Sequence, residues 1–424
     1  MRMTNEPTIR VGIMERDRVA FTLGGHYTLQ GSADIMPSNA ETAVWRSDSG
    51  VAWEGGEAAE LHFIPADNDA WFELADVTIG VNFHWERSER QRFRGALRIF
   101  PHPDMPDRLI AVNEVGVEQY LKSVISSEMS ANASEALLMA HAVMSRSWLL
   151  RQLGNMAATE HSGTRQDDGN VSGSTEIIRW YDRENHPYYD VCADDHCQRY
   201  QGITRQTTST VERAVELTRG QVLTYGGEIA DARFHKCCGG VTELFENCWE
   251  PVNHPYLQRV EDTLPGESRP LCDTDDATVL RQVLNGYDRE SNDFFRWNVT
   301  YSAEELAELL KRRSGIDFGE IERIVPLERG ASGRIVRLLV QGTRQSVTVG
   351  KELEIRRWLS PSHLRSSWFD VSRTPAGEWR FDGRGWGHGA GLCQIGAAVM
   401  GARGFSFRQI LAHYFPGTSI ETAY

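Results

Sequence analysis

Apolar residues recur at helical spacing between residues 117 and 150, and this is the strongest pattern in the chain. The apolar positions of its first half are Val117, Leu121, Val124 and Ile125. Their spacing in steps of three and four predicts a half-buried helix. After a short polar break, a second apolar pattern predicts another helix that continues to Leu150. We therefore expect a pair of helices at the centre of the fold.

Glu128 occupies the next position on the apolar stripe of the first helix. A carboxylate in the last turn of a helix lies near the negative end of the helix dipole, and an inward face removes it partly from water. Both effects favour the protonated form, so we expect the pKa of Glu128 to be raised towards the range of a general acid. The periodicity alone leaves an alternative open, in which Glu128 is an ordinary solvated carboxylate or pairs with Arg146.

The N-terminal part of the chain is expected to be β-rich. Residues 8–100 contain short apolar runs separated by Gly, Asp, Asn and Pro, which predicts a small β-module. Two further strands lead directly into the first helix. Residues 154–185 are rich in Gly, Ser, Thr, Asp and Asn, and this composition predicts a long loop.

Strands and helices also alternate in the C-terminal half. Ser302 is followed by a polar, amphipathic stretch, which predicts a capped helix, and three strands and a helix at about 351–359 follow it. The expected class is α+β. We expect a mixed, β-rich main domain with a central helix pair in residues 101–424, and a smaller β-module, N-terminal or inserted, in residues 1–100.

The composition is that of an ordinary soluble protein, with 40% hydrophobic and 25% charged residues. The net charge of -14 argues against a nucleic-acid-binding protein, which normally carries a basic patch. No apolar run approaches the ~18 residues of a membrane span, so we expect no transmembrane segment. The first residues lack the continuous apolar core of a secretory signal peptide. The sequence leaves the oligomeric state open, a homodimer included.

The seven cysteines are an odd number and are clustered, which favours metal or thiol chemistry over a complete disulfide framework. Two thiolates with one or two imidazoles are a common tetrahedral zinc set, and one segment of twelve residues contains His186, Cys192, His196 and Cys197. A local disulfide between the two cysteines is the alternative. Adjacent residues of a strand point to opposite faces, which weakens a second group, namely His235, Cys237 and Cys238.

A glycine-dense segment, residues 383–391, places Arg384, Trp386 and His388 between glycines. Glycine permits positive φ and close backbone approach, and the helical pattern that follows puts backbone amides at a helix N-terminus. Nucleotide binding is disfavoured, because the Gly-Lys-Ser/Thr ending of a phosphate loop and a dinucleotide fingerprint are both missing. An aromatic ring and an imidazole held between glycines fit the wall of a sugar-binding cleft better, and a purely structural turn is equally open.

Several long motifs resemble the stage II sporulation protein D family, also called SpoIID/LytB. They are N-E-V-G-V-E-Q-Y-L-K-S-V-I-S-S-E-M, E-A-L-L-M-A-H-A-V-M-S-R-S-W, C-Q-R-Y-Q-G, G-G-V-T-E, and G-R-G-W-G-H-G-A-G-L-C-Q-I-G-A followed by I-L-A-H-Y-F-P-G. The resemblance covers roughly residues 107–260 and 380–424, with a less certain α/β segment at about 275–375. Cys237 and Cys238 depart from the serine-containing pattern that precedes the G-G-V-T-E motif in the family.

The resemblance implies a peptidoglycan lytic transglycosylase, which cleaves denuded glycan strands between MurNAc and GlcNAc and leaves 1,6-anhydro-MurNAc ends. Glu128 matches the acid/base of the family, and Arg146 would orient it or contact sugar hydroxyls. The other substrate-binding residues expected from the resemblance are Ser127, Gln198, Tyr200, Trp386, His388 and Gln394. A zinc ion, structural or cleft-organising, is expected at His186, Cys192 and Cys197.

Two other functions stay open at this point. A non-catalytic member of the family would act as a glycan-binding or amidase-enhancing module, although Glu128 and the His–Cys group both favour catalysis. The third hypothesis is a thiol-dependent or metal hydrolase built on the cysteines. An enzyme that cleaves cell wall belongs in the cell envelope or periplasm, and the sequence shows no export signal that would take it there.

Overall fold

The computed structural model describes the 424-residue chain except residues 1–2, 32–34, 37–38, 40, 81–86, 163–170, 173–174, 182–185, 195–196, 205–207 and 284–292. The chain divides into two compact units, and neither unit is one continuous stretch of sequence. The first unit contains Met1–Asn132, Arg183–Gly220 and Thr422–Tyr424. The second unit contains Ala133–Asp182 and Gln221–Glu421.

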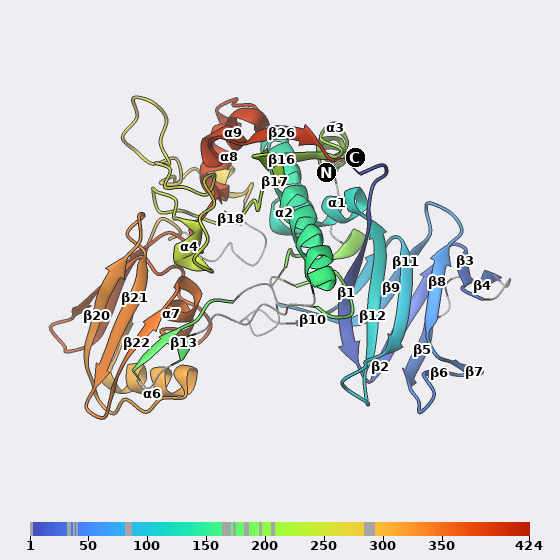
Figure 1. The fold of residues 1–424 in the computed structure, drawn as a ribbon, viewed down its shortest axis with the longest axis horizontal. Helices are drawn as coiled ribbons and strands as arrows, with labels where there is room; N and C mark the ends of the chain where they lie inside the picture. Colours follow the sequence, from blue (N-terminus) through green and yellow to red (C-terminus); the bar gives the residue numbers. More distant parts are fainter. Residues whose placement is uncertain are drawn as a thin grey trace. The chain divides into compact units, whose positions relative to one another are not determined.

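The first unit is built on two sheets (Figure 1). The larger sheet has the order β15 (Val191–Cys192), β1 (Thr8–Arg16), β12 (Leu109–Gly116), β11 (Ala96–Pro101), β8 (Leu61–Pro65), β3 (Tyr27–Leu29) and β4 (Ile35–Met36). The other sheet has the order β10 (Arg87–Phe93), β9 (Trp71–Ile79), β2 (Arg18–Gly24), β5 (Glu41–Arg46), β6 (Val51–Trp53) and β7 (Gly56–Ala58). The rings of Phe21 in β2 and Phe63 in β8 lie 5.2 Å apart, so the two sheets share one core.

Strand β12 runs without a linker into α1 (Val117–Glu128). The apolar stripe predicted for this helix is buried, because α1 packs against α3 (Ser209–Leu217) and β12. The Thr208 side chain caps α3 by accepting the N–H of Val211 at 3.3 Å, and the short 3-10 helix η1 (Gly202–Thr204) precedes it. These contacts fix the axis of α1 and therefore the place where it ends.

The central helix of the second unit is α2 (Glu135–Ser162), which packs against α8 (Gln394–Ala402), α9 (Phe407–Tyr414) and the strand β16 (Gln221–Tyr225). Strand β16 lies between β17 (Glu228–Ile229) and β26 (Ser419–Thr422). A short parallel pair joins β18 (Phe234–His235) to β25 (Leu392–Cys393), which leads directly into α8. Two one-turn helices, α4 (Phe245–Cys248) and α5 (Ala277–Leu280), lie in the long connections.

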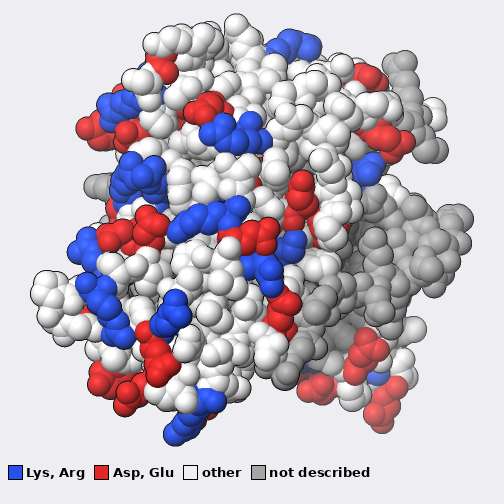
Figure 2. All heavy atoms as spheres, turned by 60° about the vertical axis from the view of Figure 1, so that its left-hand side comes forward, with Lys and Arg blue, Asp and Glu red and all other residues white. Residues whose placement is uncertain are grey.

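The rest of the second unit is a pair of sheets with two helices. One sheet has the order β13 (Val171–Ser172), β14 (Glu176–Ile178), β22 (Ser346–Gly350), β21 (Ile335–Gly342) and β20 (Ile321–Arg329), and the other has the order β19 (Arg296–Tyr301), β24 (Trp379–Arg384) and β23 (Phe369–Arg373). Helices α6 (Ala303–Ser314) and α7 (Glu352–Trp358) complete the core around Phe318 and Trp358. On the face drawn in Figure 2, basic and acidic side chains are interspersed.

The elements confirm the predicted α+β class and most of its parts. The two helices predicted between residues 117 and 150 are α1 and α2, and the capped helix after Ser302 is α6, with the reciprocal capping box in place. The loop predicted at residues 154–185 is wrong in part, because α2 continues to Ser162 and the strands β13 and β14 lie within this range. Much of the remaining loop lies outside the described residues. The domain boundary near residue 100 stays a prediction.

Candidate functional site

Glu128 is the last residue of α1, as the periodicity predicted. Its side chain is half-buried, and the neighbouring Ser127 is buried. The carboxylate oxygen Oε1 of Glu128 accepts the backbone N–H of Arg199 at 2.9 Å. A segment of chain 71 residues further on therefore holds the carboxylate at the end of the helix.

Two stacked tyrosines support this segment against α1. The rings of Tyr120 and Tyr200 lie 5.0 Å apart, and the Tyr200 hydroxyl donates to Asn113 Oδ1 at 2.6 Å. The Tyr120 hydroxyl donates to Gln198 Oε1 at 3.4 Å, and burial raises the pKa of both phenols well above the usual value. Gln198 and Tyr200 are only 1% and 2% exposed, so both are placed to position the segment that holds Glu128. Their predicted contact with sugar stays a prediction.

His186, Cys192 and Cys197 come together in the first unit, as their spacing suggested. Their ligand atoms all lie within 4.8 Å of one another, and His186 Nε2 is 3.4 Å from Cys197 Sγ. Bonds of about 2.3 Å to sulfur and about 2.1 Å to nitrogen at a tetrahedral angle put these two atoms about 3.6 Å apart. The donor set therefore fits a zinc ion. His196 lies outside the described residues.

The fold around this group fixes its ligands. Cys192 lies in β15, which pairs in parallel with β1, so that Cys192 is opposite Gly12. The ring of Tyr189 stacks on His186 with 4.7 Å between ring centroids, and it occupies the space beside Gly12, where a Cβ would come within 2.5 Å of the ring. Only glycine fits this position. Because Arg199 follows Cys197 by two residues, a metal ion bound to this group would also order the segment that binds Glu128.

Arg146 belongs to the second unit, in α2, and is fully buried. Its Nη1 donates to the carbonyl oxygen of Gln221 at 2.9 Å and to that of Ala142 at 3.4 Å. The guanidinium thus ties α2 to the start of β16. The predicted orientation of Glu128 by Arg146 is not tested by these contacts and stays a prediction.

The glycine-dense segment of the second unit pairs with the residues that follow β18. Trp386 and Cys237 exchange two backbone hydrogen bonds, of 2.8 and 3.0 Å. The half-buried Trp386 ring lies 5.0 Å from the ring of Phe294 and 5.2 Å from the guanidinium carbon of Arg365. Four alternate glycines have positive φ, namely Gly385, Gly387, Gly389 and Gly391, which explains why the segment needs glycine at this spacing.

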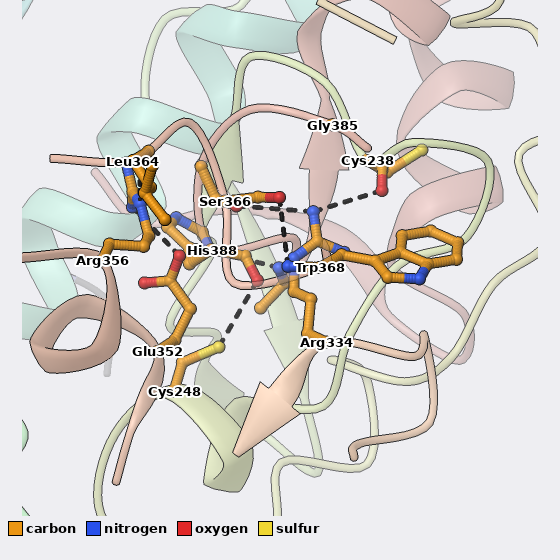
Figure 3. Close-up of polar contacts among 12 residues, drawn as sticks. Cys238, Cys248, Arg334, Glu352, Arg356, Leu364, Ser366, Trp368, Gly385 and His388 are labelled. Carbon is orange, nitrogen blue, oxygen red and sulfur yellow. Dashed lines mark hydrogen bonds and ion pairs between the residues drawn. The ribbon is translucent and has the colours of Figure 1, made fainter. Parts of the chain in front are cut away.

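Arg334, which sequence reasoning missed, supports this segment from beneath (Figure 3). Its buried guanidinium donates from Nη2 to the carbonyl oxygens of Cys238, at 3.1 Å, and Gly387, at 3.4 Å. A Cβ on Gly389 would lie 2.4 Å from the Arg334 Cζ atom, so the backbone and the guanidinium are in close contact. No motif marks Arg334, because its partners lie far away in the sequence.

His388 is half-buried and sits between aromatic neighbours. Its Nδ1 accepts the N–H of Ala390 at 3.1 Å, and its ring lies 4.8 Å from Trp249 and 5.5 Å from His235. Burial, with the charge of His235 as a second cause, lowers the pKa of His388 well below its usual value. His388 is therefore neutral at pH 7 and can act as a hydrogen-bonding group but not as a cation. Gln394, the first residue of α8, is 2% exposed.

Glu243, in the G-G-V-T-E motif, is a structural carboxylate. It is fully buried and accepts hydrogen bonds from the backbone of Leu244, Ala331 and Ser332, at 2.9, 3.0 and 3.1 Å. The Asn247 amide and the Ser332 hydroxyl donate to the same carboxylate, at 2.8 and 2.5 Å. With its oxygens so fully engaged, Glu243 anchors the turn that precedes Arg334.

The second predicted cysteine group has a different composition from the one expected. Of its members, only Cys238 belongs to a set of metal-ligating side chains in the described part of the chain, together with Asp262, Cys272 and Cys393. His235 and Cys237 are outside this set, although both interact with Cys393, and their grouping with Cys238 stays a prediction. The actual partners come from loops and strands 24 to 155 residues away.

Comparison with known proteins places these features in a family. A sequence model of the stage II sporulation protein matches residues 106–225, which include Glu128 and the His186–Cys192–Cys197 group. Stage II sporulation protein D of Bacillus amyloliquefaciens is 25% identical over 74% of this chain and 76% of its own. The protein of the same name from Bacillus subtilis (strain 168) is 24% identical over the same shares.

The chain belongs to the stage II sporulation protein D family. This SpoIID-family chain is also similar to the amidase enhancer of Bacillus subtilis (strain 168), at 25% identity over 50% of the chain and 33% of that protein. A domain of unknown function matches residues 243–391, which contain Arg334, Trp386 and His388. In the described residues, no helix combines the length and the apolar character needed to cross a membrane.

Proposed function

We propose that this SpoIID-family chain is a lytic transglycosylase that cleaves denuded peptidoglycan strands in the cell envelope. The single observation that carries the proposal is the setting of Glu128. A half-buried carboxylate ends a buried helix, and it accepts the Arg199 N–H from a segment that also contains Cys197. A carboxylate held in a fixed orientation suits a group that must both donate and accept a proton.

One carboxyl group is sufficient for this reaction. Protonated Glu128 donates its proton to the glycosidic oxygen while the oxocarbenium-like state forms at the anomeric carbon of MurNAc. The resulting carboxylate accepts the proton of the C6 hydroxyl of the same sugar, and that oxygen bonds to the anomeric carbon. The products are a 1,6-anhydro-MurNAc end and a free GlcNAc hydroxyl, Glu128 is protonated again, and no water is consumed.

The zinc group fits this proposal as a positioning element. His186, Cys192 and Cys197 would hold a zinc ion that fixes the start of the segment carrying Arg199. Arg199 then presents its N–H to Glu128, and the Tyr120–Tyr200 stack holds the segment against α1. Ser127, Arg146, Trp386, His388 and Gln394 are proposed to contact the glycan or to shape its binding site, as the family resemblance implies.

The proposal is tested by mass analysis of the products released from denuded glycan strands. We expect products with anhydro-MurNAc ends from the parent chain and none from Glu128→Gln. The matched control is Glu212→Gln, which changes an exposed glutamate of the same unit and should leave the products unchanged. Reducing ends, or equal activity in Glu128→Gln, would contradict the proposal.

A second candidate function is a non-catalytic glycan-binding or amidase-enhancing module, which the similarity to the amidase enhancer favours. In that case the chain should bind glycan strands without releasing products, and Glu128→Gln should bind them as well as the parent does. Stimulation of a separately added wall amidase, equal in the parent and Glu128→Gln, would select this function over transglycosylation.

A further inference from the structure

Three thiols and one carboxyl group meet in the interior of the second unit. They belong to Cys238, Asp262, Cys272 and Cys393, and all four residues are at most 1% exposed. Each offers one ligand atom, and these atoms lie within 4.8 Å of one another. The segments that supply them are far apart in the sequence: Cys238 follows β18, Asp262 and Cys272 bound a loop, and Cys393 ends β25. Burial of separate thiols by chance does not explain why four groups able to bind a metal ion meet at one point.

The spacing of the sulfur atoms matches one tetrahedral ion. Two thiolates bound to zinc at about 2.3 Å lie about 3.8 Å apart at the tetrahedral angle. The Sγ atoms of Cys238 and Cys272 are 3.4 Å apart, beyond the length of a disulfide and within reach of a shared ion. Cys237 is also buried and interacts with Cys272 and Cys393, so a further sulfur adjoins the set.

Backbone amides surround the sulfur atoms in the manner of thiolate ligands. Cys393 Sγ accepts the N–H of Cys238 at 3.3 Å and that of Gly396 at 3.5 Å, and Cys238 Sγ accepts the N–H of Gly240 at 3.3 Å. Cys393 is also the N-cap of α8, where the helix dipole favours a negative charge. Donors aimed at sulfur stabilise thiolates, and groups of this kind orient the ligands of metal sites.

Hydrogen bonds also orient the carboxylate of Asp262. Asp262 Oδ2 accepts the N–H of Cys272 at 2.8 Å, and Oδ1 accepts the hydroxyl hydrogen of Tyr414 at 2.6 Å. A Cβ on Gly396 would lie 2.1 Å from the Tyr414 hydroxyl and 2.4 Å from Asp262 Oδ1, so glycine is required for α8 to approach.

We propose that Cys238, Asp262, Cys272 and Cys393 form a second, structural zinc site that is separate from the His186–Cys192–Cys197 group. Three thiolates and a carboxylate are a thiolate-rich set of the kind that selects zinc. Closed four-ligand sites of this composition stabilise folds, and a fully buried one offers no access to a glycan. The site joins the segment after β18, the loop between Asp262 and Cys272, and the start of α8.

The site also has a defined mechanical role. Cys237, the residue before the first ligand, makes both backbone bonds to Trp386, and the Cys238 carbonyl accepts from Arg334. Cys393 follows the glycine-dense segment by two residues. A zinc ion at this point would therefore hold both the segment that pairs with Trp386 and the C-terminal end of the glycine-dense segment. It would do so whether or not the chain cleaves glycans.

The test is zinc content, measured by mass spectrometry after purification under reducing conditions with added Zn²⁺ and exhaustive dialysis. A Cys192→Ser background removes a ligand of the first group, so that the buried site is measured alone. In that background we expect about one zinc ion per chain, its loss in Cys272→Ser, and its retention in Cys248→Ser. Cys248 is the matched control, because it is a buried cysteine of the same unit outside the set.

If Cys272→Ser does not fold, a second measurement on the background chain tests the proposal instead. The background chain, loaded with Co²⁺ in place of Zn²⁺, should show the visible bands of a tetrahedral ion and a thiolate-to-cobalt charge-transfer band. Absence of both metals from the folded background chain would overturn the proposal. A Cys238–Cys272 disulfide, found by alkylation and peptide mass in chain purified with reductant, would also overturn it. Neither outcome bears on the glycan products, so failure here is distinct from failure of the proposed transglycosylase.

Discussion

The two cysteine clusters of this chain differ in burial and in the range of sequence that assembles them. His186, Cys192 and Cys197 are half-buried, lie within twelve residues, and adjoin the segment that binds Glu128. The set formed by Cys238, Asp262, Cys272 and Cys393 is fully buried and spans 155 residues. The first arrangement suits a site that orders a functional loop, and the second suits one that holds a fold together. Activity and stability should therefore respond to different residues.

The largest expected effect is that of Glu128→Gln on activity. Loss of a general acid lowers the rate by ~10²–10⁴-fold, and we expect no change in the midpoint of thermal unfolding, because the amide can still accept the Arg199 N–H. The measurement is the initial rate of product release beside a thermal melt, with Glu212→Gln as the control. A large fall in the melting midpoint would mean that Glu128 is a structural residue, and the division between activity and stability would fail.

Cys197→Ser should lower activity by at least about tenfold, the size of effect seen when the shell that orients a metal site is disturbed. The physical reason is that the segment before Arg199 loses an anchor, so the N–H that orients Glu128 moves. Initial rates and bound zinc are measured together. Cys248→Ser, a buried cysteine outside both clusters, should change neither. Full activity in a Cys197→Ser chain that lacks zinc would show that the His186–Cys192–Cys197 group is not needed for product release.

The stability of the second unit should depend on pH through His141. Burial lowers the pKa of His141 from 6.5 to about 3, so the unfolded state binds a proton that the folded state excludes. Stability from this group is present above pH 6.5 and is lost as the pH falls towards about 3. At about pH 5 the loss relative to neutral pH is about 2 kcal/mol.

Denaturant unfolding at about pH 5 and pH 7 measures this loss, and His141→Gln should remove most of it. His26→Gln, which changes an exposed histidine of the first unit, is the control. Equal acid sensitivity in the parent and His141→Gln would place the titrating group elsewhere. Activity at pH 7 should not distinguish the parent from His141→Gln, since the effect is on stability alone.

The smallest effect is expected at the start of α6, remote from both clusters in the sequence. The Ser302 hydroxyl accepts the Glu305 N–H at 3.1 Å, and the Glu305 side chain accepts the Ser302 N–H at 2.8 Å. Ser302→Ala should cost about 1 kcal/mol of unfolding free energy, measured in denaturant, with unchanged product release. Glu308→Ala, at an exposed position in the middle of α6, is the control and should cost less. A loss of activity in Ser302→Ala would contradict the assignment of this region to stability.

Features with a local signal could be predicted from the sequence. The end of α1 at Glu128, the capping box of α6 and the His186–Cys192–Cys197 group all depend on residues within about one helix or loop. The full length of α2 could not be predicted. Gly154 and the polar residues around it are typical of a loop, and the sequence pattern does not include the packing of the preceding turns of the helix.

Features built from distant segments could not be predicted in this way. Arg199 binds Glu128 through its backbone N–H, which every residue type but proline carries, so its side chain gives no signal. Arg334 is one of many arginines until Cys238 and Gly387 are placed beside it. Cys272 and Cys393 give no local signal, because they lie 34 and 155 residues from Cys238 in the sequence. Only the tertiary fold turns these residues into sites.

The pairing of β15 with β1 has a consequence for the protein during its synthesis. Strand β1 leaves the ribosome well before the residues that cover its outer edge, because Asp190 to Cys192 follow their partners Arg10 to Gly12 by 180 residues. An uncovered strand edge is a template for aggregation. Arg10 and Arg16 on β1 oppose it with charge, and Asp190 neutralises Arg10 at 2.8 Å once it arrives. The carboxylate of Glu128 thus gains the Arg199 N–H only after the residues that cover this edge of β1 have been made.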